Sequence, residues 1–300
     1  VMNRESIEII KSIYKPYKYT IKNSVHILDT TSGKFVLKEK KSDIRNLYNY
    51  LESRSFNNFA PLIDDSRKGV NIFSYVNDTD MPSEQKAMDL MKIVGLLHQK
   101  TTYYKDVVVD EYKKIYENLT DTINYLKYFY DNTYNEAFNY VYPSPSKYLL
   151  LTNYSKIYNA IMFSEQELEK WYQKVKDINK YRVCQVHHNL TLEHFIEGKT
   201  PTLISWDNSK KDTPVLDIYE FYKNSYFNYN FETLWHEYLK YCPWSDEEKQ
   251  LFFIVISLPP KFELKGKEFD ITKNVQKVLD YVYKTESLVR PYYTVEEKEK

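Results

Sequence analysis

The sequence predicts an α+β protein of two lobes, in which a small antiparallel β lobe precedes a large and mainly helical lobe. Strand-like runs gather in the first 76 residues, with one helical pattern between them. After the polar break at residues 77–80, apolar residues recur mostly at spacings of three and four, which is typical of helices. A chain of 300 residues is long enough for two lobes. We therefore place the N-lobe at residues 1–78 and the C-lobe at residues 79–300.

The N-lobe is predicted to contain a hairpin, one helix and a further strand. Residues 25–29 and 34–38 flank a turn that ends at Gly33, a residue that tolerates the backbone angles of tight turns. Residues 42–54 carry apolar side chains at helical spacing. The short apolar run at residues 71–76 predicts another strand, which completes an antiparallel sheet with one helix.

The C-lobe is predicted to be mostly helical. Ser83 is expected to cap a helix, and residues 112–130 carry a long apolar stripe. Ser164 and Glu167 have the spacing of a capping box, which predicts that a helix begins there. Further helices are predicted at residues 216–239, 245–258 and 274–289, and short strands at residues 182–187, 195–196 and 202–206.

Composition excludes several classes of protein. The chain contains 42 basic and 42 acidic residues, so no dominant basic face for nucleic acid or an anionic membrane is expected. The longest apolar run, residues 251–258, is too short to span a bilayer, and the first residues show no signal peptide. Cys184 and Cys242 cannot form a disulfide framework and favour a reducing compartment. We expect an intracellular, non-secreted protein that binds no nucleic acid and does not insert into membranes.

Glycine is unusually scarce, with five residues where average usage would give about 21. No two of the five lie close together in the sequence. A Rossmann fingerprint and a Walker A loop both need clustered glycines, because their backbone approaches phosphate closely. Neither loop can therefore be built from this sequence.

Three segments in the second half of the chain carry a recognisable pattern. Residues 186–196 read VHHNLTLEHFI, residues 203–207 read LISWD and residues 214–217 read PVLD. Together they resemble the catalytic loop and following motifs of the aminoglycoside phosphotransferase and choline kinase family, which read H-G-D-L-x-x-x-N, I-D-W and D-P-x-x-D-L. Residues 94–98 resemble a helix of that family, and residues 35–38 its lysine-bearing strand. The resemblance implies a two-lobed protein-kinase-like fold.

The resemblance also implies that the catalytic positions are degenerate. Asn189 stands at the family's base position, and its amide cannot accept a proton near neutral pH. His194 and Ser205 stand at the two metal-ligand positions, where a carboxylate or amide oxygen would suit Mg²⁺ better. Since all three positions differ from the family pattern, the chain resembles a pseudokinase.

Two further residues bear on nucleotide binding. Lys38 matches the lysine that contacts nucleotide phosphates in the family, and the alternative is an exposed strand lysine. Asp43 and Glu52 are the candidates for its carboxylate partner. Asp207 lies two residues beyond Ser205, on the same face of a predicted strand, and is a candidate replacement metal ligand.

The remaining residues of the pattern are expected to be structural. The matched position of His187 makes hydrogen bonds within the loop, and that of Asp217 accepts hydrogen bonds from the loop backbone. A transition-metal site made from His187, His188, His194 and Cys184 is the competing interpretation. The spacing matches no recurrent metal motif, and strand alternation sends His187 and Cys184 to opposite faces.

The segment at residues 50–63 resembles kinase-like spore-coat proteins of endospore-forming bacteria. The resemblance implies an inactive kinase-like protein that acts through contacts with other proteins, namely spore-coat components assembled from the mother-cell cytoplasm, and that requires no cofactor. Two alternatives remain: an atypical phosphotransferase that uses ATP and Mg²⁺ through Asp207, and a module that binds ATP through Lys38 without turnover. Dense tyrosines, such as Tyr222 and Tyr226, fit either core packing or a surface for protein contacts and crosslinking.

Overall fold

The computed structural model describes residues 4–22, 25–66, 69–107, 111–263 and 265–294. The chain forms two compact units. Unit 1 comprises Val1–Thr102, Cys184–Asp212 and Lys240–Cys242, and unit 2 comprises Tyr103–Val183, Thr213–Leu239 and Pro243–Lys300. An antiparallel-sheet region near the N-terminus and a larger helical region confirm the predicted α+β fold class. The lobe boundary after residue 78 stays a prediction.

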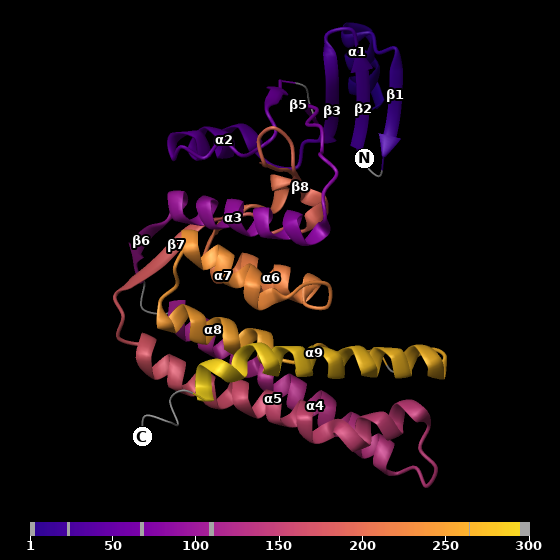
Figure 1. The fold of residues 1–300 in the computed structure, drawn as a ribbon, viewed down its shortest axis with the longest axis vertical. Helices are drawn as coiled ribbons and strands as arrows, with labels where there is room; N and C mark the ends of the chain where they lie inside the picture. Colours follow the sequence, from indigo (N-terminus) through magenta and orange to yellow (C-terminus); the bar gives the residue numbers. More distant parts are fainter. Residues whose placement is uncertain (1–3, 23–24, 67–68, 108–110, 264, 295–300) are drawn as a thin grey trace. The chain divides into compact units, whose positions relative to one another are not determined.

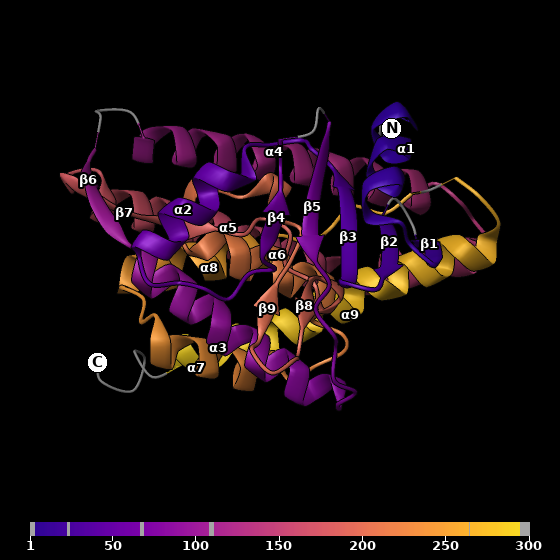
Figure 2. The ribbon, with the colours of Figure 1, turned by 90° about the horizontal axis from the view of Figure 1, so that it is seen from above.

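Unit 1 contains a five-stranded antiparallel sheet with the strand order β1-β2-β3-β5-β4. Figure 2 shows these strands side by side. The predicted hairpin is confirmed: Leu28 pairs with Phe35 across it. Gly33 has a φ of 135°, and the Thr30 hydroxyl donates to its carbonyl oxygen at 2.8 Å, which closes the turn. The strands are β1 (Lys18–Lys22), β2 (Val25–Thr30), β3 (Gly33–Glu39), β4 (Leu62–Asp64) and β5 (Val70–Ser74).

Helix α1 (Arg4–Tyr14) was not expected from the sequence, nor was strand β1. Buried Ile7 and Ile10 of α1 pack against one face of the sheet, and the Tyr14 ring meets Phe35 edge-on at 5.0 Å. The sequence does carry a signal for this helix, since Ile7, Ile10 and Tyr14 recur at spacings of three and four residues.

Two more helices belong to unit 1 and were expected. Helix α2 (Ile44–Ser53) begins after Asp43, whose carboxylate accepts a hydrogen bond from the Asn46 backbone N–H at 3.2 Å. Helix α3 (Ser83–Thr101) buries its predicted inward face. The expected cap at Ser83 is wrong, because Pro82 occupies the cap position and the Ser83 hydroxyl donates to Glu84 instead.

The middle of the chain supplies short strands. Strand β7 (Lys180–Val186) pairs through its first half with β6 (Tyr103–Asp106) in unit 2 and through its second half with β10 (Lys210–Asp212) in unit 1. Strands β8 (Phe195–Ile196) and β9 (Thr202–Leu203) form a small hairpin. The strand predicted at residues 202–206 is therefore too long, because the chain leaves it after Leu203.

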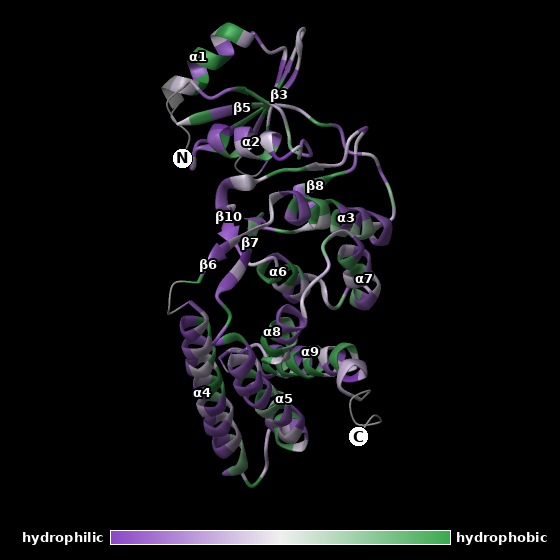
Figure 3. Cartoon of the chain, turned by 90° about the vertical axis from the view of Figure 1, so that its left-hand side faces the viewer, coloured by the Kyte–Doolittle hydropathy of each residue, from purple (hydrophilic) through white to green (hydrophobic). Residues whose placement is uncertain are grey.

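Unit 2 is built mainly from helices, and α4 and α5 pack along each other (Figure 1). Figure 3 shows both hydrophobic and hydrophilic residues along these two helices, as expected where one face is buried. The helices are α4 (Glu111–Phe138), α5 (Pro145–Val175), α6 (Val215–Ser225), α7 (Phe231–Tyr241), α8 (Asp246–Ser257) and α9 (Glu268–Thr294), α7 ending in unit 1.

The capping box predicted at Ser164 is wrong, because α5 runs through this position without a break. The Ser164 hydroxyl is buried and lies 3.1 Å from two carbonyl oxygens, those of Ala160 and Ile254, and it can donate to either. A capping box does occur at Ser245, whose side chain accepts from the Glu248 N–H while the Glu248 carboxylate accepts from the Ser245 N–H. This cap begins the predicted helix α8.

The helix predicted over residues 216–239 is two helices, α6 and α7, separated by the asparagine-bearing segment 226–230. Tyr222 is buried and its hydroxyl lies 2.7 Å from that of Thr285, so this tyrosine belongs to the core of unit 2. Tyr226 meets the ring of Tyr281 edge-on at 4.9 Å. In the described part of the chain, no helix has the length and hydropathy that a membrane span requires.

Candidate functional site

The predicted site lies on the turn that follows β9. Ser205 adopts a left-handed backbone conformation, with φ 69° and ψ 50°, and Trp206–Asn208 form one turn of 3₁₀-helix. The Trp206 indole is buried, donates to the Leu203 carbonyl oxygen at 3.0 Å and meets the His187 ring at 4.7 Å. Trp206 therefore anchors the turn and fixes the positions of Ser205 and Asp207 on either side of it.

Lys38 meets both of these residues. Its ammonium group donates to the Ser205 hydroxyl at 3.3 Å and forms an ion pair with Asp207. The two charged side chains are only 22% and 16% exposed. Residues nearly 170 positions apart in the sequence are therefore joined within unit 1.

The carboxylate partner of Lys38 is thus Asp207, and the two candidates named from the sequence are not. Asp43 caps α2, and its carboxylate is engaged by Asn46. Glu52 lies on the exposed side of the same helix. The sequence placed the acidic partner on the neighbouring helix, whereas the fold supplies it from the turn after β9.

Tyr48 of α2 was not predicted to be part of the site. Its ring is buried and stacks on Phe59, with ring centroids 4.0 Å apart. Burial, and to a smaller degree the negative charge of Asp207, raise the pKa of the Tyr48 hydroxyl far above its usual range. Tyr48 therefore stays neutral beside the ion pair. The helical stripe at residues 42–54 predicted its burial, but its proximity to Asp207 depends on the tertiary fold.

The histidines of the loop make hydrogen bonds to the main chain. His187 Nε2 lies 2.9 Å from the Ile204 oxygen, and His194 Nδ1 lies 2.9 Å from the Asn189 oxygen. A carbonyl oxygen can only accept, so these two nitrogens carry the protons. His188 has a φ of 56°, in the left-handed region. These contacts hold the loop that carries Asn189, which is half-buried.

Metal binding by these histidines was the competing interpretation. Among the described residues, no group of three or more His, Cys, Asp or Glu side chains could hold a metal ion. Cys184 is buried, and its thiol donates to the Asp212 carbonyl oxygen at 3.6 Å. Asp217 lies fully buried in the first turn of α6, in unit 2, and its role towards the loop stays a prediction.

The side chains present suit nucleotide phosphate better than they suit Mg²⁺. The Lys38 ammonium is a point charge of the kind that binds phosphate. Asp207 and Ser205 offer Mg²⁺ one carboxylate and one neutral hydroxyl, and the carboxylate is already neutralised by Lys38. Asn189 can orient an attacking hydroxyl by hydrogen bonding, but it cannot remove its proton. Bound Mg²⁺ would supply charge stabilisation at the phosphates.

Solved structures resemble the whole chain. An aminoglycoside phosphotransferase from Alicyclobacillus acidocaldarius subsp. acidocaldarius DSM 446 superposes with a TM-score of 0.65 at 10% sequence identity, covering 92% of each chain. The chain has the aminoglycoside phosphotransferase fold. Spectinomycin phosphotransferase APH(9)-Ia, solved with ADP and spectinomycin, has this fold too and matches with a TM-score of 0.50 at 11% identity, covering 95% of this chain and 99% of its own. No protein-family model and no curated protein sequence matches the chain.

These likenesses confirm the kinase-like fold that the sequence predicted. In this chain the residues of the predicted pattern lie on short connections, namely the turn after β9 and the loop after β7. At identities of 10–11%, these likenesses show the fold alone, and the function depends on the side chains of this chain.

Proposed function

We propose that this chain is a pseudokinase: it has the aminoglycoside phosphotransferase fold, transfers no phosphate and acts through contacts with other proteins. The ion pair between Lys38 and Asp207 carries this proposal. A phosphotransferase needs a carboxylate that holds the metal at the nucleotide phosphates, in addition to the carboxylate that pairs with its lysine. In the described site, Asp207 is the carboxylate that lies beside Ser205, and it already pairs with Lys38.

Asn189 adds a second obstacle. General base catalysis typically contributes about 10²–10⁴-fold to a rate, and an amide cannot provide it. The Ser205 hydroxyl adds no charge for a divalent cation. A nucleotide that entered this site would have to displace Asp207 from Lys38 without a metal to compensate the freed carboxylate.

We propose spore-coat assembly as the biological context, with coat proteins as partners. The support is the resemblance of residues 50–63 to kinase-like spore-coat proteins. A fluorescent fusion of the full chain, expressed in a sporulating bacterium that carries this sequence, is expected to gather at the surface of the developing spore. Uniform fluorescence of the mother cell throughout sporulation would contradict this context.

One observation favours a second candidate, an atypical phosphotransferase. The proximity of Asp207 to Lys38 and Ser205 places a carboxylate beside the phosphate-binding lysine. The relatives in fold named above are phosphotransferases, and one was solved with ADP. This candidate requires that Mg²⁺ bind the Asp207 carboxylate and replace Lys38 as its partner. A nucleotide-binding module without turnover would instead need Lys38 alone.

A thermal-shift titration separates the three functions. For the pseudokinase, millimolar ATP is expected to leave Tm unchanged with Mg²⁺ and with EDTA, whereas a ligand at one hundred times its Kd would stabilise the fold by about 2.7 kcal/mol. A shift that needs Mg²⁺ and is lost in Asp207→Ala would establish the phosphotransferase site instead. A shift that survives EDTA and is lost in Lys38→Ala, but not in the exposed control Lys41→Ala, would establish the nucleotide-binding module.

A further inference from the structure

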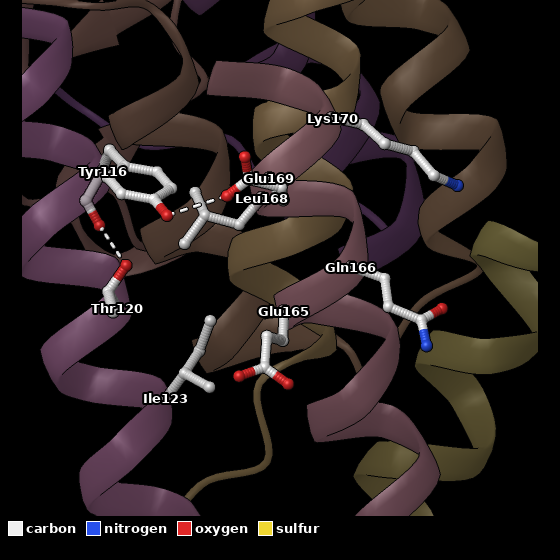
Figure 4. Close-up of a pocket in the computed structure, with 8 residues that line it drawn as sticks. All are labelled: Tyr116, Thr120, Ile123, Glu165, Gln166, Leu168, Glu169 and Lys170. Atoms are coloured by element: carbon white, nitrogen blue, oxygen red, sulfur yellow. Dashed lines mark hydrogen bonds between the residues drawn. The ribbon is translucent and has the colours of Figure 1, made fainter. Parts of the chain in front are cut away.

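Helices α4 and α5 of unit 2 are joined by two hydrogen bonds between a tyrosine and a carboxylate. The Tyr116 hydroxyl of α4 donates to the Glu169 carboxylate of α5 at 2.8 Å, and Figure 4 shows this bond beside a cavity of about 550 Å³. The Tyr154 hydroxyl of α5 donates in turn to the Asp131 carboxylate of α4. The two helices therefore make the same contact in both directions.

Each donating tyrosine also packs its ring on a second tyrosine. Tyr116 stacks on Tyr172, with ring centroids 4.4 Å apart and planes inclined by 23°. Tyr154 packs on Tyr134, again with centroids 4.4 Å apart, at 38°. In both cases the second tyrosine follows the accepting carboxylate by three residues, so the two lie on the same face of one helix. We call these arrangements the Tyr116/Tyr172 pair and the Tyr134/Tyr154 pair.

This arrangement suits the loss of an electron together with a proton. The hydrogen bond to Glu169 and partial burial raise the pKa of the Tyr116 hydroxyl, and burial and the hydrogen bond to Asp131 raise the pKa of Tyr154 far above its usual range. Both phenols are therefore neutral at physiological pH. Removal of an electron makes a phenol strongly acidic, and the carboxylate that already accepts the hydrogen bond takes the proton. Both carboxylates belong to exposed residues and can pass the proton to water.

Close tyrosine rings elsewhere in unit 2 lack such an acceptor. The rings of Tyr226 and Tyr281 lie 4.9 Å apart. Their hydroxyls donate to backbone carbonyl oxygens, that of Lys277 at 3.4 Å and that of Ile256 at 2.7 Å. A carbonyl oxygen accepts a hydrogen bond but does not take up a proton near neutral pH. Ring contact alone therefore does not reproduce the two pairs between α4 and α5.

We propose that the Tyr116/Tyr172 pair and the Tyr134/Tyr154 pair are sites of oxidative crosslinking, at which the oxidised haem of a peroxidase joins α4 to α5 covalently. Each tyrosine of a pair loses one electron to the haem and one proton, which goes to the carboxylate from the donating tyrosine and to water from the other. The two tyrosyl radicals form a carbon–carbon bond between the ring positions next to their hydroxyls. A shift of hydrogen from those carbons to the oxygens restores both phenols.

The two electrons and two protons released per bond reduce one molecule of hydrogen peroxide to two of water, which balances the reaction. The modification does not depend on the proposed function, because both pairs lie in unit 2, whereas Lys38 and Asp207 lie in unit 1.

The test treats the dilute full chain with a haem peroxidase and hydrogen peroxide. We expect the monomer to lose two hydrogen atoms per bond by mass spectrometry, and peptide mapping to place the bonds within the two pairs. Glu169→Gln keeps a hydrogen-bond acceptor but removes the proton acceptor, and should slow the Tyr116/Tyr172 bond by about tenfold or more. Glu165→Gln is the matched control, because Glu165 lines the same cavity in Figure 4 but pairs with Lys127 at 2.5 Å, and it should change neither rate.

A second variant keeps the proposal falsifiable if Glu169→Gln folds poorly. Asp131→Asn should slow the Tyr134/Tyr154 bond and leave the other pair as an internal reference. Bonds that form mainly at the most exposed tyrosines, such as Tyr142 at 91% and Tyr17 at 75%, would overturn the proposal, because exposure would then decide the site. Equal rates in the wild type and in folded Glu169→Gln or Asp131→Asn would overturn it as well.

Discussion

Replacing Trp171 with alanine is expected to lower the free energy of unfolding by about 3–5 kcal/mol, the usual cost of removing a buried large aromatic side chain. The Trp171 side chain is 1% exposed and lies in the core cluster that joins α4, α5, α8 and α9. Tyr112 packs edge-on against it, with ring centroids 5.9 Å apart. The indole N–H also donates to the Glu247 carbonyl oxygen at 3.1 Å, so the alanine variant loses a hydrogen bond as well.

The measurement is thermal unfolding followed by circular dichroism, where this loss should lower Tm by about 5–8 °C. Trp171→Phe is the matched control, because it keeps most of the apolar volume and loses the hydrogen bond. We expect it to cost about 1–3 kcal/mol, which is smaller than the alanine effect. A loss under about 1 kcal/mol in Trp171→Ala would mean that these four helices do not share one core.

Ser205→Asp is expected to confer Mg²⁺-dependent ATP binding, which the proposed pseudokinase lacks. Asp is among the residues that tolerate the left-handed backbone region that Ser205 occupies, with φ 69°. The new carboxylate would stand beside Lys38 and Asp207, so one anion could pair with the lysine while the other meets the metal. Mg²⁺ bound by one or two carboxylates and nucleotide phosphates is the common arrangement in proteins.

In the thermal-shift assay, this variant should gain several degrees with ATP and Mg²⁺, and nothing with ATP and EDTA. Ser55→Asp is the matched control, since Ser55 is exposed and has a similar φ of 59°. Turnover should remain absent until Asn189→Asp is added, which restores a proton acceptor worth about 10²–10⁴-fold. If Ser205→Asp gains no Mg²⁺-dependent shift, the lysine does not face a nucleotide phosphate in this protein.

The sequence predicted those features of the fold that depend on neighbouring residues. The hairpin around Gly33 follows from turn chemistry and the helix within residues 42–54 follows from apolar spacing, and both are present. The predicted cap at Ser164 is wrong, although Ser164 and Glu167 have the same spacing as the true cap residues Ser245 and Glu248. The two cases differ because α5 is buried on both sides of Ser164 and continues through it. Propensity cannot distinguish these two cases without the packing of α8 against α5.

The candidate site shows the same limit, because the sequence identifies residues but not the contacts between them. The loop pattern placed Lys38, Ser205 and Asp207 on the list of candidate residues, but the distances between them follow from the fold alone. A strand in which Ser205 and Asp207 share a face was the wrong reason for their proximity, because the chain leaves β9 at Leu203 and turns through a left-handed residue. Tyr48 was assigned only to a buried face, and nothing local in the sequence links it to Asp207.

The discontinuity of unit 1 has a consequence for the order of events on the ribosome. Strands β1–β5 and helix α3 leave the exit tunnel early, but Asp207, in the segment Cys184–Asp212 of the same unit, is made about a hundred residues after Thr102. At translation rates of about 5–20 residues per second, that delay lasts roughly 5–20 s. During this interval the nascent chain already holds the α4–α5 hairpin, whose contacts are local and form fast. The Lys38 ammonium group therefore cannot form its ion pair until Asp207 emerges from the ribosome.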